Sequence, residues 1–127
     1  MESTEPIATH LPLVLIVDDD NDIRESFAHL LGDRGYDVVE AHHGQAALDY
    51  LATQPLPALI VLDLMMPVMS GEEFRRIQLA DPRLASIPVV VMSAAERGSA
   101  IATELGAEFL PKPARMQQLL TVVKRHC

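Results

Sequence analysis

Short apolar runs alternate with amphipathic segments along the chain from residue 13 onward. Each run stops at polar residues, glycine or proline, and together they cover residues 13–17, 37–41, 59–62, 87–92 and 107–110. Runs this short and this apolar are typical of strands buried on both faces of a parallel sheet. The pattern therefore predicts five strands, and the third of them ends on a single carboxylate, Asp63.

Between and after these runs, apolar residues recur at helical spacing. They predict helices over residues 23–31, 44–51, 71–80, 95–105 and 116–126. The fourth of these is the weakest, because Gly98 inside it costs about 1 kcal/mol relative to alanine. Strands that alternate with helices in this way predict a doubly wound α/β fold, in which helices cover both faces of a parallel sheet.

The same pattern makes three local predictions about the helices. Asn21 or Asp22 is expected to cap the first helix, because Asn and Asp side chains accept hydrogen bonds from free helix amides. In the third helix, Ile77 is expected to face the core and Arg75 to point outward. In the last helix, Met116 is expected to belong to the buried apolar face.

Length and composition limit the classes of function. A chain of 127 residues with 49% hydrophobic content suits one domain, predicted over residues 13–127, after a loose tail over residues 1–12. The formal net charge of -8 argues against nucleic-acid binding, which needs basic patches. The single cysteine, Cys127, cannot form an internal disulfide, which favours a reducing compartment. Without a secretory signal or an apolar run long enough for a membrane, we expect a cytoplasmic protein with no membrane association.

Polar residues stand where the predicted strands end. Asp18 and Asp19 follow the first strand, Asp63 ends the third, Ser93 the fourth, and Lys112 follows the fifth. The carboxyl ends of parallel strands share one edge of a sheet, so these side chains should meet there. Three carboxylates in one place repel one another unless a cation lies between them, and hard oxygen ligands suit Mg²⁺. Such a centre favours phosphoryl transfer, with Asp63 as the nucleophile because the other two acids are left to hold the metal.

Four motifs at these strand ends resemble those of the receiver domain of two-component response regulators. They are residues 15–20 (LIVDDD), residues 62–67 (LDLMMP) with Gly71, residues 91–94 (VMSA), and residues 109–113 (FLPKP). Each motif alone is weak, but all four in order are specific, and the resemblance covers about residues 13–126. It implies a flavodoxin-like five-stranded sheet with the strand order 2-1-3-4-5.

The resemblance also implies roles for the acidic residues. Asp63 would accept a phosphoryl group from a histidine kinase or a histidine phosphotransfer protein. Asp18 and Asp19 would hold Mg²⁺ together with Asp63, with Asp19 as the more direct ligand, and Met65 would give its backbone carbonyl to the metal. The domain would assist its own phosphorylation and dephosphorylation without being a turnover enzyme.

Further roles implied by the resemblance concern the phosphoryl oxygens and the response to them. Ser93 and Lys112 would bind the oxygens, helped by the backbone N–H of Ala94. Phe109 matches the aromatic switch residue that turns inward together with Ser93. The bond between Lys112 and Pro113 resembles the cis peptide of the family.

Output is expected to occur through a protein partner. We expect that partner on the face formed by the fourth helix, fifth strand and fifth helix, because Ser93 and Phe109 lie at the base of this face. The domain is expected to be a monomer or weak dimer. Ser93 and Lys112 are 19 positions apart, which is shorter than usual in the family, so the fourth helix should be reduced.

Three alternatives stay open. The chain resembles a degenerate receiver that serves only as a binding module, or a receiver excised from a longer protein. It also resembles, less closely, a Mg²⁺-dependent hydrolase with an aspartyl nucleophile, although Met65 stands where such an enzyme has a second Asp. His42 and His43 are interpreted as loop residues before a helix, and His29 as an outward helix position.

Overall fold

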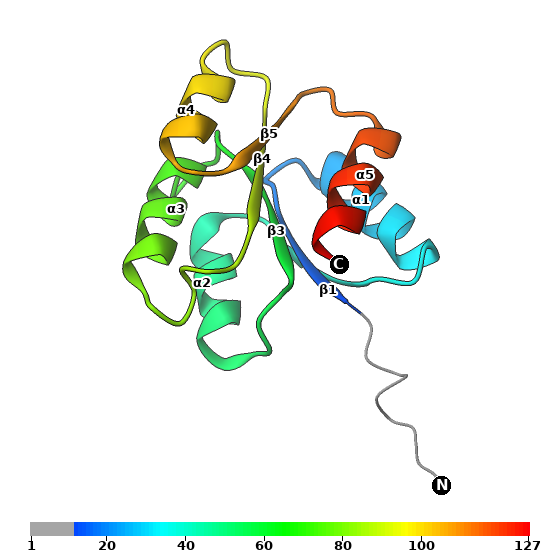
Figure 1. Cartoon of the computed structure of the whole chain (residues 1–127), viewed down its shortest axis with the longest axis horizontal. Helices are drawn as coiled ribbons and strands as arrows, with labels where there is room; N and C mark the ends of the chain where they lie inside the picture. Colours follow the sequence, from blue (N-terminus) through cyan, green and yellow to red (C-terminus); the bar gives the residue numbers. More distant parts are fainter. Residues whose placement is uncertain (1–11) are drawn as a thin grey trace, which may run out of the picture.

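The computed structural model describes residues 12–127, so the predicted tail over residues 1–12 lies outside the described residues except for Pro12. Five parallel strands form one sheet with the order β2-β1-β3-β4-β5 (Figure 1). Their bounds are β1 Leu13–Val17, β2 Asp37–Ala41, β3 Leu59–Asp63, β4 Val89–Ser93 and β5 Glu108–Pro111. The predicted strand order is therefore confirmed.

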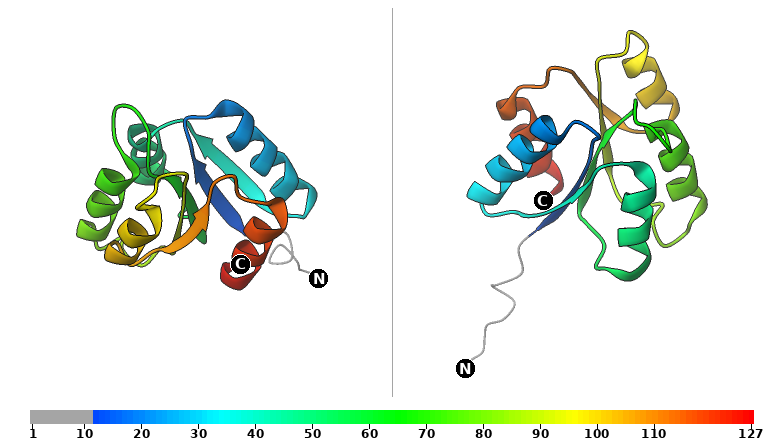
Figure 2. Two further views of the ribbon diagram at one scale, coloured as in Figure 1. Left: turned by 90° about the horizontal axis from the view of Figure 1, so that it is seen from above. Right: turned by 180° about the vertical axis from the view of Figure 1, so that it is seen from behind.

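Five helices connect the strands and cover both faces of the sheet. They are α1 Asn21–Asp33, α2 Gly44–Thr53, α3 Gly71–Ala80, α4 Gly98–Glu104 and α5 Met116–His126. Helices α1 and α5 lie on one face, and α2, α3 and α4 lie on the other (Figures 1 and 2). The doubly wound α/β fold is confirmed, and α4, with seven residues, is the shortest of these helices. Within residues 12–127, no helix is long and apolar enough to cross a membrane.

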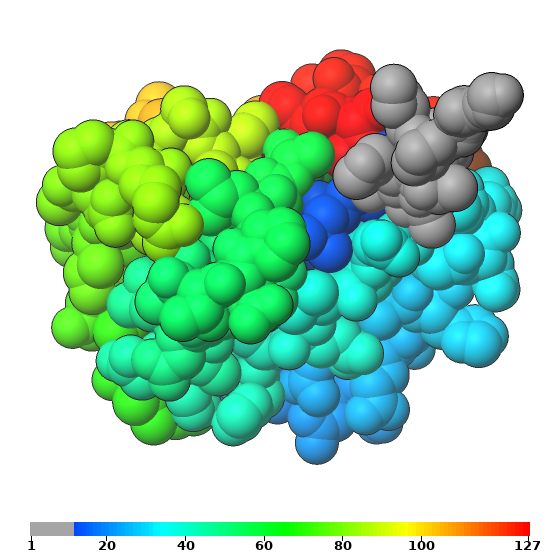
Figure 3. Space-filling model, turned by 90° about the horizontal axis from the view of Figure 1, so that it is seen from below, coloured from blue at the N-terminus to red at the C-terminus, as the bar shows by residue number. Residues whose placement is uncertain are grey.

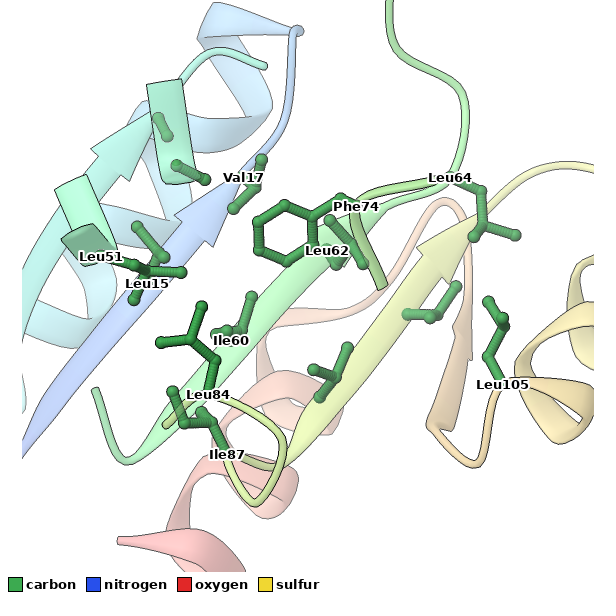
Figure 4. Close-up of a cluster of buried hydrophobic side chains, with 14 of the residues drawn as sticks. Leu15, Val17, Leu51, Ile60, Leu62, Leu64, Phe74, Leu84, Ile87 and Leu105 are labelled. Carbon is green, nitrogen blue, oxygen red and sulfur yellow. The ribbon is translucent and has the colours of Figure 1, made fainter. Parts of the chain in front are cut away.

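Two apolar clusters, one on each face, hold the helices to the sheet. Because side chains alternate along a strand, Leu15 and Val17 of β1 belong to one cluster and Val14 and Ile16 to the other. Figure 4 shows the first cluster, in which Phe74 of α3 packs against the central strands. All five residues of β3 and all five of β4 are buried, so the middle of the sheet is closely packed on both faces and supports the ends of these strands.

The two edges of the sheet differ in what they expose. The amino ends of the strands and the loop between α2 and β3 lie on the side seen in Figure 3. The carboxyl ends of the strands lie on the opposite side, which faces the viewer in the left view of Figure 2. The sequence places the candidate site residues at this second edge.

Two predicted helix starts are wrong. Helix α1 is capped by Asp20, whose carboxylate accepts the amide hydrogen of Ile23 at 3.1 Å, and not by Asn21 or Asp22. Asp20 has the extended backbone that a cap needs, whereas Asn21 already belongs to the helix. Helix α4 starts at Gly98 and not at residue 95, because residues 94–97 turn away from the end of β4.

The predicted positions of three helix side chains are also wrong. For Arg75 the structure shows the cause. Arg75 is buried, with 6% of its surface exposed, and donates to the carbonyls of Leu105 (3.1 Å) and Gly106 (3.3 Å). These carbonyls lie at the end of α4, where the helix leaves acceptors without partners, so a buried donor is needed there. Ile77 and Met116, predicted to be buried, are 40% and 46% exposed.

Candidate functional site

The register of the sheet brings the ends of β3, β4 and β5 together. Asp63 is the partner of Met92, and Ser93 is the partner of Pro111. One residue further along, the Lys112 amide donates to the Ser93 carbonyl at 2.9 Å. Asp63, Ser93 and Lys112, far apart in the sequence, therefore lie at the same edge of the sheet.

Three aspartates converge at this edge. One carboxylate oxygen from each of Asp18, Asp19 and Asp63 lies within 4.8 Å of the others. Asp18 and Asp63 are buried (0% and 4% exposed), while Asp19 is exposed and can reach both the site and water. Hard oxygen donors with an open side suit Mg²⁺, which keeps several of its waters.

The environment of Asp18 supports the fit to a cation. Its Oδ1 accepts the Asp20 amide hydrogen at 2.9 Å, which fixes the carboxylate. Among residues 12–127, no group forms a hydrogen bond of good geometry with its buried Oδ2, although the Lys112 Nζ forms an ion pair with this oxygen at 3.0 Å. A buried carboxylate oxygen is costly without a full set of partners, and a metal ion is one such partner.

Lys112 lies between two of the acids. Its Nζ is 3.0 Å from Asp18 Oδ2 and 3.4 Å from Asp63 Oδ2. Burial by itself would lower the pKa of Lys112, but the two carboxylates outweigh burial and raise its pKa, so the ammonium group keeps its charge. The site therefore contains a fixed positive charge in contact with Asp63.

The surroundings of Asp63 change the pKa of its carboxyl group. Burial raises the pKa of Asp63 from 3.8 to about 6, and the negative charge of Asp18 acts in the same direction, while Lys112 partly opposes them. The Met65 amide is 3.4 Å from Asp63 Oδ1 and also favours the charged form. The Met65 side chain is 66% exposed beside the site. A carboxylate held in this way is poorly solvated and more basic than usual.

Gly71 allows the start of α3 to lie against the end of β3. A Cβ at this position would lie 2.2 Å from the Asp63 carbonyl oxygen. The Gly71 amide donates to the Leu64 carbonyl at 2.9 Å. Any side chain here would force the two backbones apart and displace Asp63.

Ser93, Ala94 and Phe109 lie at the predicted edge, with Gly98 beside them. Ser93 is buried, and its Oγ accepts the Ala95 amide hydrogen at 3.0 Å, which leaves the hydroxyl hydrogen able to donate. Ala94, the next residue, is exposed. Phe109 is half-buried, and a Cβ on Gly98 would lie 2.9 Å from its ring and 3.1 Å from Ser93 Cβ. Helix α4 therefore begins directly against both residues.

The structure also defines the conformations of Pro113, His43 and His29. The peptide bond between Lys112 and Pro113 is cis, as expected. His43 caps α2 by accepting the Ala46 amide hydrogen on Nδ1 at 3.0 Å. The side chain of His29 points outward, with 84% of its surface exposed.

Sequence reasoning missed Arg24, which is buried next to the acidic residues. Its Nη1 donates to the Asp18 carbonyl at 2.8 Å, and its Nε donates to the Glu40 carboxylate at 3.0 Å. The sequence pattern contained a sign of its burial, because Arg24 lies on the same face of the helix as Phe27 and Leu31, which are buried.

A doubly wound α/β fold with three aspartates and a lysine at the carboxyl edge of its sheet defines the class of small receiver-type domains. The sequence profile of the response regulator receiver domain matches residues 14–124. The chain belongs to this family, which consists of signalling modules of two-component systems.

Relatives and solved structures agree with this assignment. Response regulator MprA of Mycobacterium avium (strain 104) is 39% identical over 110 residues, which cover 84% of this chain and 47% of the relative. A response regulator receiver protein from Pseudomonas putida has a TM-score of 0.84 and 34% identity, covering 91% of this chain and 98% of that one. The receiver domain of a histidine kinase from Syntrophus aciditrophicus has a TM-score of 0.82 and 32% identity, covering 90% and 88%. The chain thus spans about half the length of the curated relatives it matches.

Proposed function

We propose that the protein is a phosphoacceptor, and that Asp63 receives a phosphoryl group from a phosphohistidine of a histidine kinase or phosphotransfer protein. The observation that carries the proposal is the contact of one buried carboxylate, Asp63, with the fixed ammonium group of Lys112 at 3.4 Å, beside two further aspartates. The phosphoryl group is anionic, so its transfer depends mainly on positioning and on neutralising charge.

The transfer joins phosphorus to Asp63 and releases the histidine of the donor. An Oδ atom of Asp63 bonds to phosphorus, and the bond between phosphorus and the histidine nitrogen of the donor breaks. The electron pair stays on that nitrogen, and the imidazole takes up a proton. Lys112 Nζ, the Ser93 hydroxyl and the Ala94 amide would hold the phosphoryl oxygens, and the charge of Lys112 favours the anionic product.

The acidic residues would hold Mg²⁺ at the same edge. Asp18, Asp19 and Asp63 offer carboxylate oxygens, and the carbonyl of Met65 is the proposed backbone ligand. The bound ion would supply positive charge beside the phosphoryl oxygens. It would also lower the pKa of Asp63, because a nearby cation favours the charged carboxylate.

The signal would leave by a change in population between two conformations of the surface. Ser93 and Phe109 are the proposed switch residues, and the proposed output surface is the face of α4, β5 and α5. The packing of Ser93 and Phe109 against the start of α4 supports this, because a shift of either residue would move the helix. The occupant of this surface would be a protein partner, with the domain acting as a monomer or weak dimer in the cytoplasm.

Intact-mass measurement after incubation with acetyl phosphate and Mg²⁺ tests the proposal. The wild type should gain the mass of one phosphoryl group, and Asp63→Asn should gain none. Asp49→Asn removes an exposed acid on α2 and should behave as the wild type. A wild-type mass that does not change would contradict the proposal and favour a degenerate binding module, whereas continued release of phosphate from small phosphoesters would favour a hydrolase.

A further inference from the structure

We infer that Arg24 is a positioning residue for the metal-binding aspartates. The inference rests on the proposed function, since it concerns the Mg²⁺ site of the phosphoacceptor. Arg24 lies on α1, one helical turn after the cap Asp20, and only 9% of its surface is exposed. A buried guanidinium group requires partners, and Arg24 has two, on two different segments.

The first partner is the backbone of the acidic loop. Arg24 Nη1 donates to the Asp18 carbonyl at 2.8 Å, in a buried contact. This carbonyl belongs to the peptide group that joins Asp18 to Asp19. Its orientation therefore decides where both carboxylates lie, and the charged hydrogen bond from Arg24 fixes that orientation.

The second partner holds the guanidinium group itself. Arg24 Nε donates to the Glu40 carboxylate at 3.0 Å, near the end of β2. The Asp18 amide donates to the carbonyl of Ala41, the next residue of β2, at 3.1 Å. Asp18 is therefore held at its amide, its carbonyl and its side-chain Oδ1. The amide contacts β2 directly, and the carbonyl is linked to β2 through Arg24.

Removal of the guanidinium group has two opposite consequences for Mg²⁺. By charge alone, the loss of a cation near three carboxylates should strengthen Mg²⁺ binding. By position, a buried carbonyl without a donor costs free energy, so we expect its peptide to turn toward water and to move Asp18 and Asp19 out of place. Residues that orient metal ligands typically contribute 10- to 100-fold to metal affinity. Position should therefore prevail, and Mg²⁺ affinity should fall about 10-fold in Arg24→Met.

The experiment is calorimetric titration of the whole chain with Mg²⁺ for wild type, Arg24→Met, Arg24→Lys and Arg34→Met. Arg34 is an exposed arginine at the other end of α1, so its replacement removes the same charge without touching the site. Arg24→Met should bind Mg²⁺ about 10-fold more weakly than wild type. Arg24→Lys, which keeps one donor, should recover part of the affinity, and Arg34→Met should equal wild type.

Urea unfolding of each variant and amide NMR shifts of Asp19 and Asp20 without Mg²⁺ accompany the titration. Displaced amide signals in a folded Arg24→Met, together with weaker binding, support the inference. Unchanged or stronger Mg²⁺ binding in Arg24→Met overturns it, even if that variant is less stable. If Arg24→Met does not fold, Arg24→Lys decides by the same two readouts. Failure of the wild type to bind Mg²⁺ overturns the metal site of the proposed function and the inference with it.

Discussion

The substitution Asp63→Asn should stabilise the folded protein at neutral pH in the absence of divalent cations. Burial raises the pKa of Asp63 from 3.8 to about 6, so the folded protein binds this proton more tightly than the unfolded chain. The stability due to the proton is fully present below pH 3.8 and is lost as the pH rises through about 6. Above that pH, the folded wild type holds a poorly solvated charge that asparagine lacks.

The size of the effect follows from the two pKa values. Each unit of pKa difference between folded and unfolded protein corresponds to about 1.4 kcal/mol. The difference between 3.8 and about 6 therefore gives about 3 kcal/mol as an upper value. Water at the open side of the site screens the charge, and the expected gain in the free energy of unfolding at pH 7.5 is about 2 kcal/mol. Near pH 4 the gain should almost vanish.

Urea unfolding followed by circular dichroism measures this difference, with EDTA present at pH 4, 5, 6 and 7.5. Circular dichroism is used because the chain has no tryptophan, so unfolding cannot be followed by tryptophan fluorescence. Asp49→Asn is the matched control, because it makes the same change of residue type at an exposed position on α2. If Asp63→Asn is no more stable than wild type at pH 7.5, or if its gain is the same at pH 4 and pH 7.5, then the pKa of Asp63 is not raised in the folded protein.

Three further substitutions and one matched control test backbone strain and close packing near the site by urea unfolding. Val68 has a φ of 71°, which is strained for a β-branched residue. Val68→Gly should therefore stabilise the fold by about 0.5–1 kcal/mol, and a loss of stability would contradict the strain. Gly71→Ala should destabilise the fold by about 3 kcal/mol, because its Cβ would lie 2.2 Å from the Asp63 carbonyl oxygen. An unchanged stability would mean that the start of α3 can move away from the end of β3 without cost. Gly98→Ala should destabilise the fold by about 1 kcal/mol, because the added Cβ contacts Phe109. The matched Gly32→Ala should stabilise the fold by about 1 kcal/mol, because its Cβ would meet nothing within 4 Å and alanine favours the helix. Equal effects at the two glycines would refute the contact.

Much of the fold and of the candidate site could be predicted from the pattern of the chain. Apolar runs of five residues with breakers after them specify buried strands, because such runs have no polar face to give to water. Once the strands are parallel, their carboxyl ends share an edge, and Asp18, Asp63 and Lys112 must meet there. Only strand periodicity and the geometry of parallel sheets are needed for this step.

The orientation of the charged residues could not be predicted in the same way. Arg75 stands next to Arg76 and was expected to point outward, yet it is buried against the end of α4. Arg24 was not expected at the site, yet it fixes the Asp18 carbonyl. In both cases the deciding partner is a backbone carbonyl that another element leaves without a donor.

The sequence by itself therefore determined the alternation of strands and helices, the edge of the sheet at which the candidate site lies, and the family to which the chain belongs. The tertiary structure alone decided the pKa of Asp63, the close approach of Gly71 and Gly98, and the roles of the buried arginines. The physical reason is that hydrophobic periodicity is local along the chain, whereas desolvation, steric contact and the pairing of buried polar groups depend on atoms brought together from distant segments.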